Sequence, residues 1–325
     1  MAERTAFVSG GSGFIGGRLI RRLVDDGWTV TALARSDRSA AAVEALGAEA
    51  ARGDLDDVGS LQGGTVGCDV CFHAAAFVGE WGKPREYERG NVDGTRNMLD
   101  AARASGVRRF VHVGTEAALL AGDPLVNVDE EAPLRPDSRA SYARTKAKAE
   151  ELVRAEERME TVVVRPRFVW GAGDTTILPG VVEAVKRGRF SWIGGGRHRT
   201  STTHVGNVVH GLVLGAERGT PGEAYFVTDG EPVVFRDFIT ELLATQDVEI
   251  PDRNAPRRVV GALAAVSEAA WNRLPLPGGP PVTRMAYWVS SQECTIDISK
   301  ARRELGYEPV VSRNEGMNEL RGHGA

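Results

Sequence analysis

The chain has 325 residues, of which 42% are hydrophobic and 26% charged, and its formal net charge is -4 at pH 7. This length can bury one large core or two modest ones. The absence of a basic excess speaks against a nucleic-acid partner. The sequence contains no run of about 18 apolar residues, so we expect no stable membrane insertion. Because residues 1–4 lead directly into an apolar segment without a leader pattern, we expect a cytoplasmic protein.

The first predicted unit is a strand, a glycine-rich loop and a helix between residues 5 and 27. Gly10, Gly13 and Gly16 stand three apart, between the apolar run Thr5–Ser9 and a segment with helical spacing. Glycines here let the chain turn sharply, touch a pyrophosphate and pack a helix closely on a strand. The free N–H groups of the helix then favour phosphate. We therefore predict dinucleotide binding rather than an ordinary glycine-rich loop.

Strands and helices alternate along the first half of the chain. This alternation predicts an α/β protein with a doubly wound parallel (Rossmann) sheet, whose ligands gather at the carboxyl ends of the strands. The further predicted strands are 29–34, 48–52, 70–75, 110–114 and 162–165, and the further helices are 40–46, 87–104 and 138–159.

Beyond Trp170 the glycine and proline content rises, which predicts a second, smaller substrate lobe. We assign residues 1–168 to the dinucleotide-binding domain and 169–325 mainly to the substrate lobe. A helix in 200–216 and a strand in 224–230 are expected, and 200–230 should return to the first domain. An apolar helix over 259–271 suits either a membrane surface or a pocket lid, and its few basic residues favour the lid.

The three cysteines predict neither a metal site nor a disulfide. Cys68 and Cys71 form one C-x-x-C in a run that we interpret as a buried strand. Residues three apart in a strand point to opposite faces, so the two thiols suit neither one metal ion nor one bond. We expect both to be small packing residues.

The residues after the second predicted strand indicate the type of cofactor. Enzymes that prefer NAD usually place a carboxylate here for the ribose 2′-hydroxyl, and a 2′-phosphate requires positive charge instead. Ala34 is neutral and Arg35 follows it, with Arg38 close behind. We predict NADP over NAD, and we place the Asp54 carboxylate near the adenine, although it could also cap a helix.

Tyr142 and Lys146 are four residues apart in a predicted helix, so they share one face. A phenol titrates near pH ~10 and is a poor acid or base at neutrality. The Lys146 ammonium, together with the positive nicotinamide of the oxidised cofactor, should lower the pKa of the phenol toward the working pH. Thr115, at the carboxyl end of another predicted strand, is placed to hold a substrate carbonyl beside Tyr142.

Eight motifs in order together resemble the extended short-chain dehydrogenase/reductase superfamily, and less specifically its 3β-hydroxysteroid dehydrogenase branch. They are SGGSGFIG (9–16), GDL (53–55), HAAA (73–76), NVDGTRN (91–97), GT (114–115), YARTK (142–146), RPRFVWG (165–171) and HVGNV (204–208). Two departures are Ser9, where Thr is more usual, and Gly206, where Asp is often found.

The resemblance implies a catalytic set of Thr115, Tyr142 and Lys146, and it leaves Asn91 as a structural residue. The implied cofactor-binding residues are Gly10, Gly13, Phe14, Ile15, Gly16, Arg35, Asp54, Leu55, Ala74, Ala75, Ala76, Tyr142, Lys146, Pro166, Phe168 and Val169. It also implies a homodimer.

Phe77, Trp81, Glu116 and Trp192 are the expected substrate-binding residues. With Phe168, their aromatic members would form one flat-walled apolar pocket for a ring substrate, unless they are ordinary packing residues. Arg197 and Arg199 would alternatively clamp a pyrophosphate, as nucleotide-sugar epimerases of the superfamily do.

The expected reaction is hydride transfer between NADP(H) and a secondary alcohol or ketone, with a small molecule as substrate and no metal. One alternative is a nucleotide-sugar epimerase or dehydratase with a tightly bound NAD(P). A second is a redox-sensing binding protein, which the intact Tyr142 and Lys146 pair disfavours.

Overall fold

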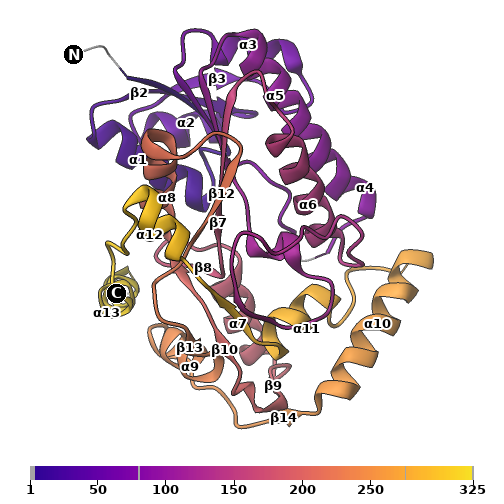
Figure 1. Ribbon diagram of the computed structural model, residues 1–325. Coiled ribbons are helices and arrows are strands. Elements are labelled where there is room, and N and C mark those ends of the chain that lie inside the picture. Colours follow the sequence, from indigo (N-terminus) through magenta and orange to yellow (C-terminus); the bar gives the residue numbers. More distant parts are fainter. Residues whose placement is uncertain (1–3, 80, 275, 324–325) are drawn as a thin grey trace.

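The computed structural model describes residues 4–79, 81–274 and 276–323 (Figure 1). Its largest element is a seven-stranded sheet in the order β12-β7-β5-β4-β1-β2-β3, with every neighbouring pair parallel. The strands are β1 (Thr5–Ser9), β2 (Thr29–Ala34), β3 (Glu49–Arg52), β4 (Val70–His73), β5 (Arg109–Val113), β7 (Glu160–Pro166) and β12 (Glu223–Val227). The predicted α/β class with a doubly wound parallel sheet is confirmed. Residues 1–3, on which the expectation of no leader depended, lie outside the described residues.

Helices cover both faces of this sheet because side chains alternate between the faces along each strand. Phe7, Cys71 and Phe110 face α3 (Val58–Thr65), α5 (Gly94–Ala104) and α6 (Ser141–Arg154) in one buried cluster. The alternate residues face α1 (Phe14–Asp25), α2 (Asp37–Glu44), α8 (Val205–Arg218) and α12 (Ser299–Leu305) in the other. Apolar cores on both faces therefore hold the sheet.

Several element boundaries differ from those predicted. The strand β4 begins at Val70, so Cys68 lies in the preceding turn and not in a strand with Cys71. The helix α2 begins at Asp37 rather than 40, because the Ser36 side chain accepts a hydrogen bond from the Ser39 N–H. The predicted helix over 87–104 is α4 (Pro84–Tyr87), a π-helical segment (Glu88–Asp93) and α5. The helix α6 is shorter than the predicted 138–159.

The second lobe contains a four-stranded sheet in the order β13-β10-β15-β6. Its strands are β6 (Leu125–Val128), β10 (Arg199–Thr200), β13 (Val233–Val234) and β15 (Cys294–Ile296). The strand β6 was not predicted. It comes from the first half of the sequence but pairs with β15 in the sheet of the second lobe. In the opposite direction, β12 returns to pair with β7, and α8 packs on the large sheet. The chain therefore crosses between the two lobes several times.

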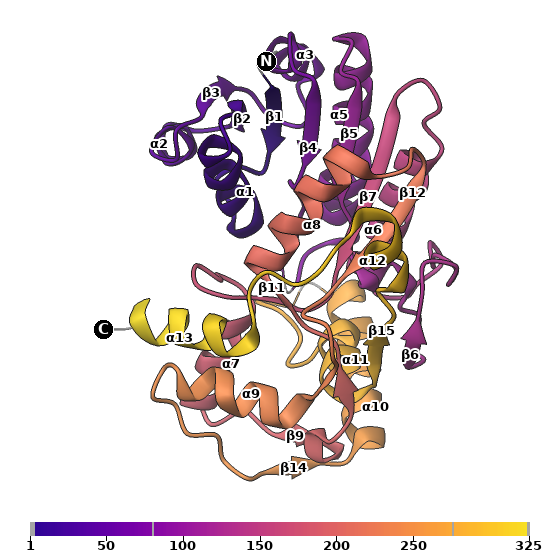
Figure 2. The same cartoon turned by 60° about the vertical axis from the view of Figure 1, so that its left-hand side comes forward.

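The rest of the second lobe combines two-residue strands with helices, and many of these elements surround a separate apolar core (Figure 2). The strands are β8 (Val169–Trp170), β9 (Trp192–Ile193), β11 (Thr203–His204) and β14 (Asn254–Ala255). The helices are α7 (Ile177–Lys186), α9 (Phe235–Ala244), α10 (Arg257–Arg273), α11 (Arg284–Ser291) and α13 (Arg313–His323), with the 3-10 turn η3 (Gly194–Gly196). Another 3-10 turn, η2 (Glu116–Leu119), follows β5 and packs on α6. The predicted helix over 259–271 is α10, which packs on α11.

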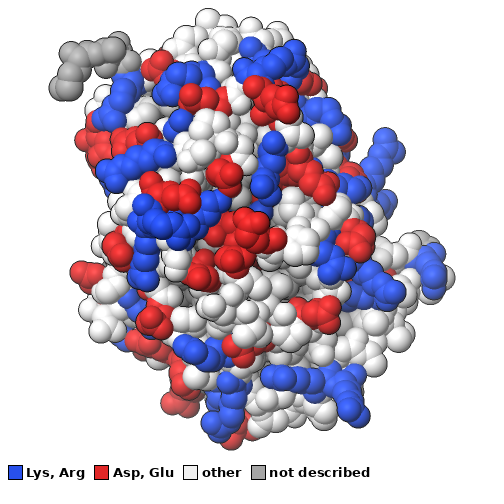
Figure 3. Space-filling model, viewed as in Figure 1, with Lys and Arg blue, Asp and Glu red and all other residues white. Residues whose placement is uncertain are grey.

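Side chains of both charges are interspersed over the face of the molecule drawn in Figure 3. Among the described residues, no helix combines the length and the apolar character that crossing a bilayer requires.

Candidate active site

The glycine loop between β1 and α1 is built so closely that side chains would not fit. Gly10 has a φ of +73°, and a Cβ on it would lie 2.6 Å from the Ala75 nitrogen. A Cβ on Gly16 would lie 2.2 Å from the Gly10 carbonyl oxygen. The N-cap residue of α1, Gly13, provides no side-chain hydrogen bond. The first N–H groups of α1, which begins with Phe14, thus lack a side-chain cap, and this open cradle fits a pyrophosphate.

The same contacts bring other expected cofactor residues to this loop. Ala74 and Ala75 follow β4 and lie directly against Gly10. Ile15 lies in the first turn of α1 and is half-buried against the core. Pro166 ends β7, opposite Val227 of β12. These segments lie at the carboxyl ends of neighbouring strands, where the fold predicts a ligand.

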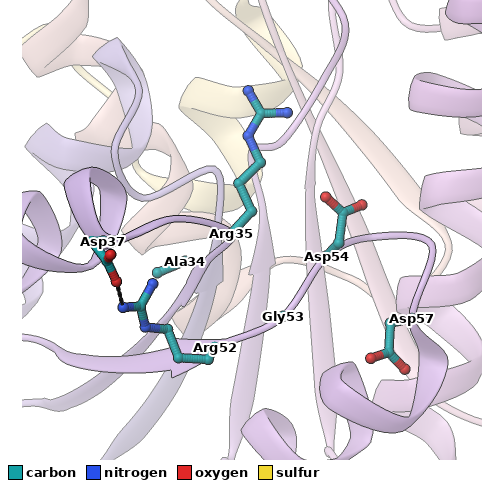
Figure 4. A pocket seen from close by; sticks show the side chains of 7 residues that line it. All are labelled: Ala34, Arg35, Asp37, Arg52, Gly53, Asp54 and Asp57. Carbon is teal, nitrogen blue, oxygen red and sulfur yellow. Dashed lines mark hydrogen bonds and ion pairs between the residues drawn. The ribbon is translucent and has the colours of Figure 1, made fainter.

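A cavity of about 440 Å³ lies at the ends of β2 and β3 (Figure 4). Arg35 and Asp54, both expected to bind the cofactor, line this cavity, whereas Arg38 is exposed on α2 outside this lining. Asp37 and Arg52, which the sequence analysis did not select, also line it and form an ion pair. Arg35 extends in a different direction in Figure 4 and has no hydrogen bond or ion pair to any described residue. The Arg35 guanidinium therefore has no counter-ion among the described residues.

Leu55 turns away from this cavity. Its side chain belongs to the core between the sheet and α5, and its carbonyl oxygen accepts a hydrogen bond from Asn97 Nδ2 at 2.8 Å.

Lys146 is buried one helical turn after Tyr142 on α6. Its Nζ donates to the Val113 carbonyl oxygen at 2.7 Å and lies 3.2 Å from Nε2 of the buried His112. Burial lowers the pKa of Lys146 to about 8, and the nearby Glu150 carboxylate partly opposes this effect. His112 was not among the predicted residues, although its place two residues before Gly114 at the end of β5 was a usable signal.

Tyr142 is half-buried in the first turn of α6. Burial raises the pKa of this phenol above its ordinary value, the Glu116 carboxylate raises it further, and the nearby Thr115 hydroxyl partly opposes these effects. In the protein without cofactor, the Lys146 ammonium is turned toward Val113 and His112, and the expected acidic phenol with bound nicotinamide stays a prediction. The phenol therefore stays protonated at neutral pH.

Glu116, expected to contact substrate, instead forms a buried ion pair with Arg167. Arg167 Nη1 donates to Glu116 Oε1 at 2.6 Å, and both side chains are 3% exposed. The Thr115 hydroxyl lies 2.9 Å from Glu116 Oε2 and donates to it. Sequence reasoning missed Arg167, although a charged residue between Pro166 and Phe168 in an apolar motif was a signal.

The aromatic residues do not form the expected single pocket. Phe168 packs edge-on against Phe235 and Phe238, and Trp192 against Phe190, all in the second-lobe core. Phe168 was expected to bind cofactor and Trp192 substrate, but long-range packing buries both side chains in this core.

Phe77 belongs elsewhere, with its ring edge-on to Tyr87 at 4.8 Å. Its backbone is held by the Asn91 amide, whose Oδ1 accepts from the Phe77 N–H at 2.7 Å, so Asn91 has a structural contact. Trp81 lies against Gly279, where a Cβ would be 3.1 Å from the Trp81 Cβ.

Apolar residues of η2 and α11 pack around Tyr142 instead. This buried cluster contains Ala117, Leu120, Ala140, Ala143, Met285, Tyr287 and Trp288. Tyr287 also lies against α10, since a Cβ on Gly261 would be 2.9 Å from its ring. The second lobe thus supplies an apolar wall beside the phenol, with α10 behind it.

Comparisons with known proteins agree with this arrangement. Residues 7–257 match the family described as 3-beta hydroxysteroid dehydrogenase/isomerase. The 4-hydroxy-2-methyl-3-oxo-4-farnesyl-3,4-dihydroquinoline-1-oxide ketoreductase of Stigmatella aurantiaca is 46% identical over 97% of this chain and 95% of its own length. The 2-alkyl-3-oxoalkanoate reductase of Stenotrophomonas maltophilia is 35% identical over 98% of both chains. The crystal structure of gox2253 aligns with a TM-score of 0.80 at 27% identity, covering 99% of both chains.

Proposed function

Because the chain belongs to the 3-beta hydroxysteroid dehydrogenase/isomerase family, an oxidoreductase family of the extended short-chain dehydrogenase/reductase superfamily, we propose that it reduces a ketone to a secondary alcohol with NADPH. Thr115, Tyr142 and Lys146 form its proposed catalytic set. The bound nicotinamide would supply the hydride to the carbonyl carbon. The half-buried phenol of Tyr142, one helical turn before the buried Lys146 on α6, is the observation that carries this proposal.

The proposed cofactor site extends along the carboxyl edge of the large sheet. The loop of Gly10, Gly13 and Gly16 would hold the pyrophosphate against α1. Arg35 would bind the 2′-phosphate, since its guanidinium has no partner among the described residues. Asp54, in the same cavity, would face the adenine. The proposed preference for NADP over NAD therefore depends on Arg35 and on the neutral Ala34 at the end of β2.

In the proposed mechanism, Tyr142 donates its proton to the ketone oxygen. The raised pKa of the phenol suits this direction, because a general acid must hold its proton before it reacts. Thr115 positions the ketone oxygen beside the phenol. Lys146 stabilises the phenolate left after proton transfer and holds the nicotinamide ribose.

The proposed substrate is a ring ketone with apolar surroundings. The wall of Met285, Tyr287 and Trp288 beside Tyr142 favours an apolar body. The Stigmatella aurantiaca relative is named for a farnesylated dihydroquinoline ketone, which has both a ring and an apolar chain. For a nucleotide sugar, Arg197 and Arg199 would have to clamp a pyrophosphate, but both are exposed, and Arg199 donates to the Pro232 carbonyl oxygen.

The test is NADPH oxidation with 3-ketosteroids, aryl ketones, farnesylated quinolone-type ketones and UDP- or dTDP-sugars. We expect net NADPH consumption with ketones and none with the sugars. Tyr142→Phe should lower kcat by about 10²- to 10⁴-fold and leave the Kd for NADPH within twofold. Unchanged turnover in this variant, or sugar epimerisation without net oxidation, would refute the proposal.

We also propose the homodimer that the superfamily resemblance implies, paired through α5 and α6. The helices lie side by side on one face of the large sheet, with Tyr142 in the first turn of α6. Sedimentation at micromolar concentration should give about twice the mass of the chain, and a monomer there would contradict this proposal.

A further inference from the structure

We infer that the substrate carries no charge near its ketone, and that Glu116 sets this preference by neutralising Arg167. The inference rests on the proposed reductase function and assigns Glu116 a role in specificity. It is carried by one buried contact next to the proposed catalytic threonine and by the charge state of the groups around that contact.

The Glu116–Arg167 pair is closed to water. Both side chains are 3% exposed and joined at 2.6 Å. Arg167 Nη2 also donates to Thr200 Oγ1 at 3.3 Å, while Nε has no partner among the described residues. Separating two buried opposite charges would leave each of them uncompensated, which is strongly unfavourable where water is excluded. Glu116 and Arg167 therefore stay paired, and together they contribute no net charge.

The pair lies within reach of the proposed reaction centre. Thr115 donates to Glu116 Oε2 at 2.9 Å, so Arg167 is separated from the Thr115 hydroxyl only by the carboxylate. An anionic group next to the substrate ketone would meet Glu116 before it reached the guanidinium. Two carboxylates at such a distance repel each other strongly where water is excluded.

Two titratable neighbours of Arg167 add no positive charge at pH 7. His198 lies near Arg167, and burial lowers its pKa to about 4, so it is neutral at pH 7. Burial raises the pKa of the Cys294 thiol to about 12, so this neighbour is neutral as well. Lys146 is also buried and donates to the Val113 carbonyl oxygen, and the buried Arg165 is paired with Glu150. The groups around the ketone site therefore favour an uncharged substrate over a carboxylate.

The two relatives described above differ in this property. One is named for a farnesylated dihydroquinoline-1-oxide ketone, which carries no carboxylate, and the other for a 2-alkyl-3-oxoalkanoate, which does. We expect this chain to prefer a substrate of the first kind because Glu116 already neutralises Arg167.

The experiment uses two ketones that differ only in charge, a freshly hydrolysed 2-alkyl-3-oxoalkanoate and its methyl ester. NADPH oxidation by the whole protein should give a kcat/KM at least tenfold higher for the ester. In Glu116→Gln, Arg167 keeps its charge but loses its counter-ion, and its Nε already lacks a partner among the described residues, so the site would then favour a carboxylate. The ratio of carboxylate to ester should then rise at least tenfold. The double variant Glu116→Gln/Arg167→Gln has no net charge and should restore the preference for the ester.

Substrate binding measured by tryptophan fluorescence with NADP⁺ present should show the same order of affinities. Thermal unfolding of each variant shows whether it folds. If Glu116→Gln does not fold, the inference is tested by the preference of the wild-type protein for ester over carboxylate and by its affinities for the two compounds. A wild-type preference for the carboxylate, or a ratio unchanged in folded Glu116→Gln, would overturn the inference while leaving the reductase proposal intact. Absence of NADPH oxidation with every ketone tested would overturn the reductase proposal itself.

Discussion

The part of the molecule that contains the seven-stranded sheet and the second lobe are built in different ways. The large sheet has strands of four to seven residues, and helices cover both of its faces; from β1 to β4, each strand is joined to the next by a helix. In the second lobe, β8, β9, β10, β11, β13 and β14 have two residues each. Their partners are distant in sequence, as in the pairing of Thr200 with Cys294.

This difference decides which half can be predicted from local patterns. A regular strand and helix carry their own apolar period, so β1 and β2 begin and end at the residues predicted. A two-residue strand carries no period, and only distant partners define it. In the part of the chain that forms the large sheet, single substitutions at local positions such as the glycine loop should therefore have large effects. In the second lobe, the largest effects should come from substitutions in the shared apolar core.

The largest expected effect is in the second-lobe core. Trp192→Ala should lower the free energy of unfolding by about 3–5 kcal/mol, because this side chain is 2% exposed and packs against Phe190 and Arg236. Chemical denaturation measures the change. Trp192→Phe is the control and should lose less than half as much. A raised KM with unchanged stability would instead make Trp192 a substrate contact.

The glycine loop provides the next effect. Gly16→Ala should raise the Kd for NADPH on the order of 100-fold, or about 2.7 kcal/mol, because its methyl group would displace the Gly10 carbonyl. Gly17→Ala is the matched control. A Cβ there would meet nothing closer than 3.4 Å, so titration of NADPH fluorescence should show little change. Equal losses in both variants would contradict a local steric cause.

The choice of cofactor depends on a smaller interaction. Arg35→Ala should lower kcat/KM for NADPH by about 10- to 150-fold, the value of a charged hydrogen bond of 1.5–3 kcal/mol, and leave NADH within threefold. Steady-state kinetics with both cofactors measures the change. Arg38→Ala, exposed outside the cavity, serves as the control. If wild-type kcat/KM is higher with NADH than with NADPH, the NADP proposal is wrong.

The smallest expected effect is a pH dependence of the activity that arises from Lys146. Burial lowers the pKa of Lys146 to about 8, so its charge is present below that pH and is lost as the pH rises through it. Because the proposed role requires the ammonium, kcat/KM should fall about tenfold per unit above pH 8. Whatever activity Lys146→Arg retains should stay level to pH 10, since a guanidinium does not deprotonate there. A profile of the same shape in both proteins would exclude Lys146 as its cause.

The spacing of Tyr142 and Lys146 in the sequence was enough to place both on one helix near Thr115. The state of the phenol could not be predicted in this way. It depends on Glu116 and on the orientation of Lys146 toward Val113, which are contacts between separate elements. The same reason explains why Glu116 was assigned to substrate and Arg167 was overlooked. Residue types and local order were predictable, whereas the pairing of buried charges required the fold.

The exchange of strands between the lobes has a consequence for how such proteins diversify. Since β6 belongs to the four-stranded sheet and β12 to the seven-stranded sheet, no single cut in the chain separates the lobes. Recombination with one breakpoint would leave one sheet without a strand. New substrate preferences are therefore more accessible through point substitutions and loop changes than through exchange of a whole module.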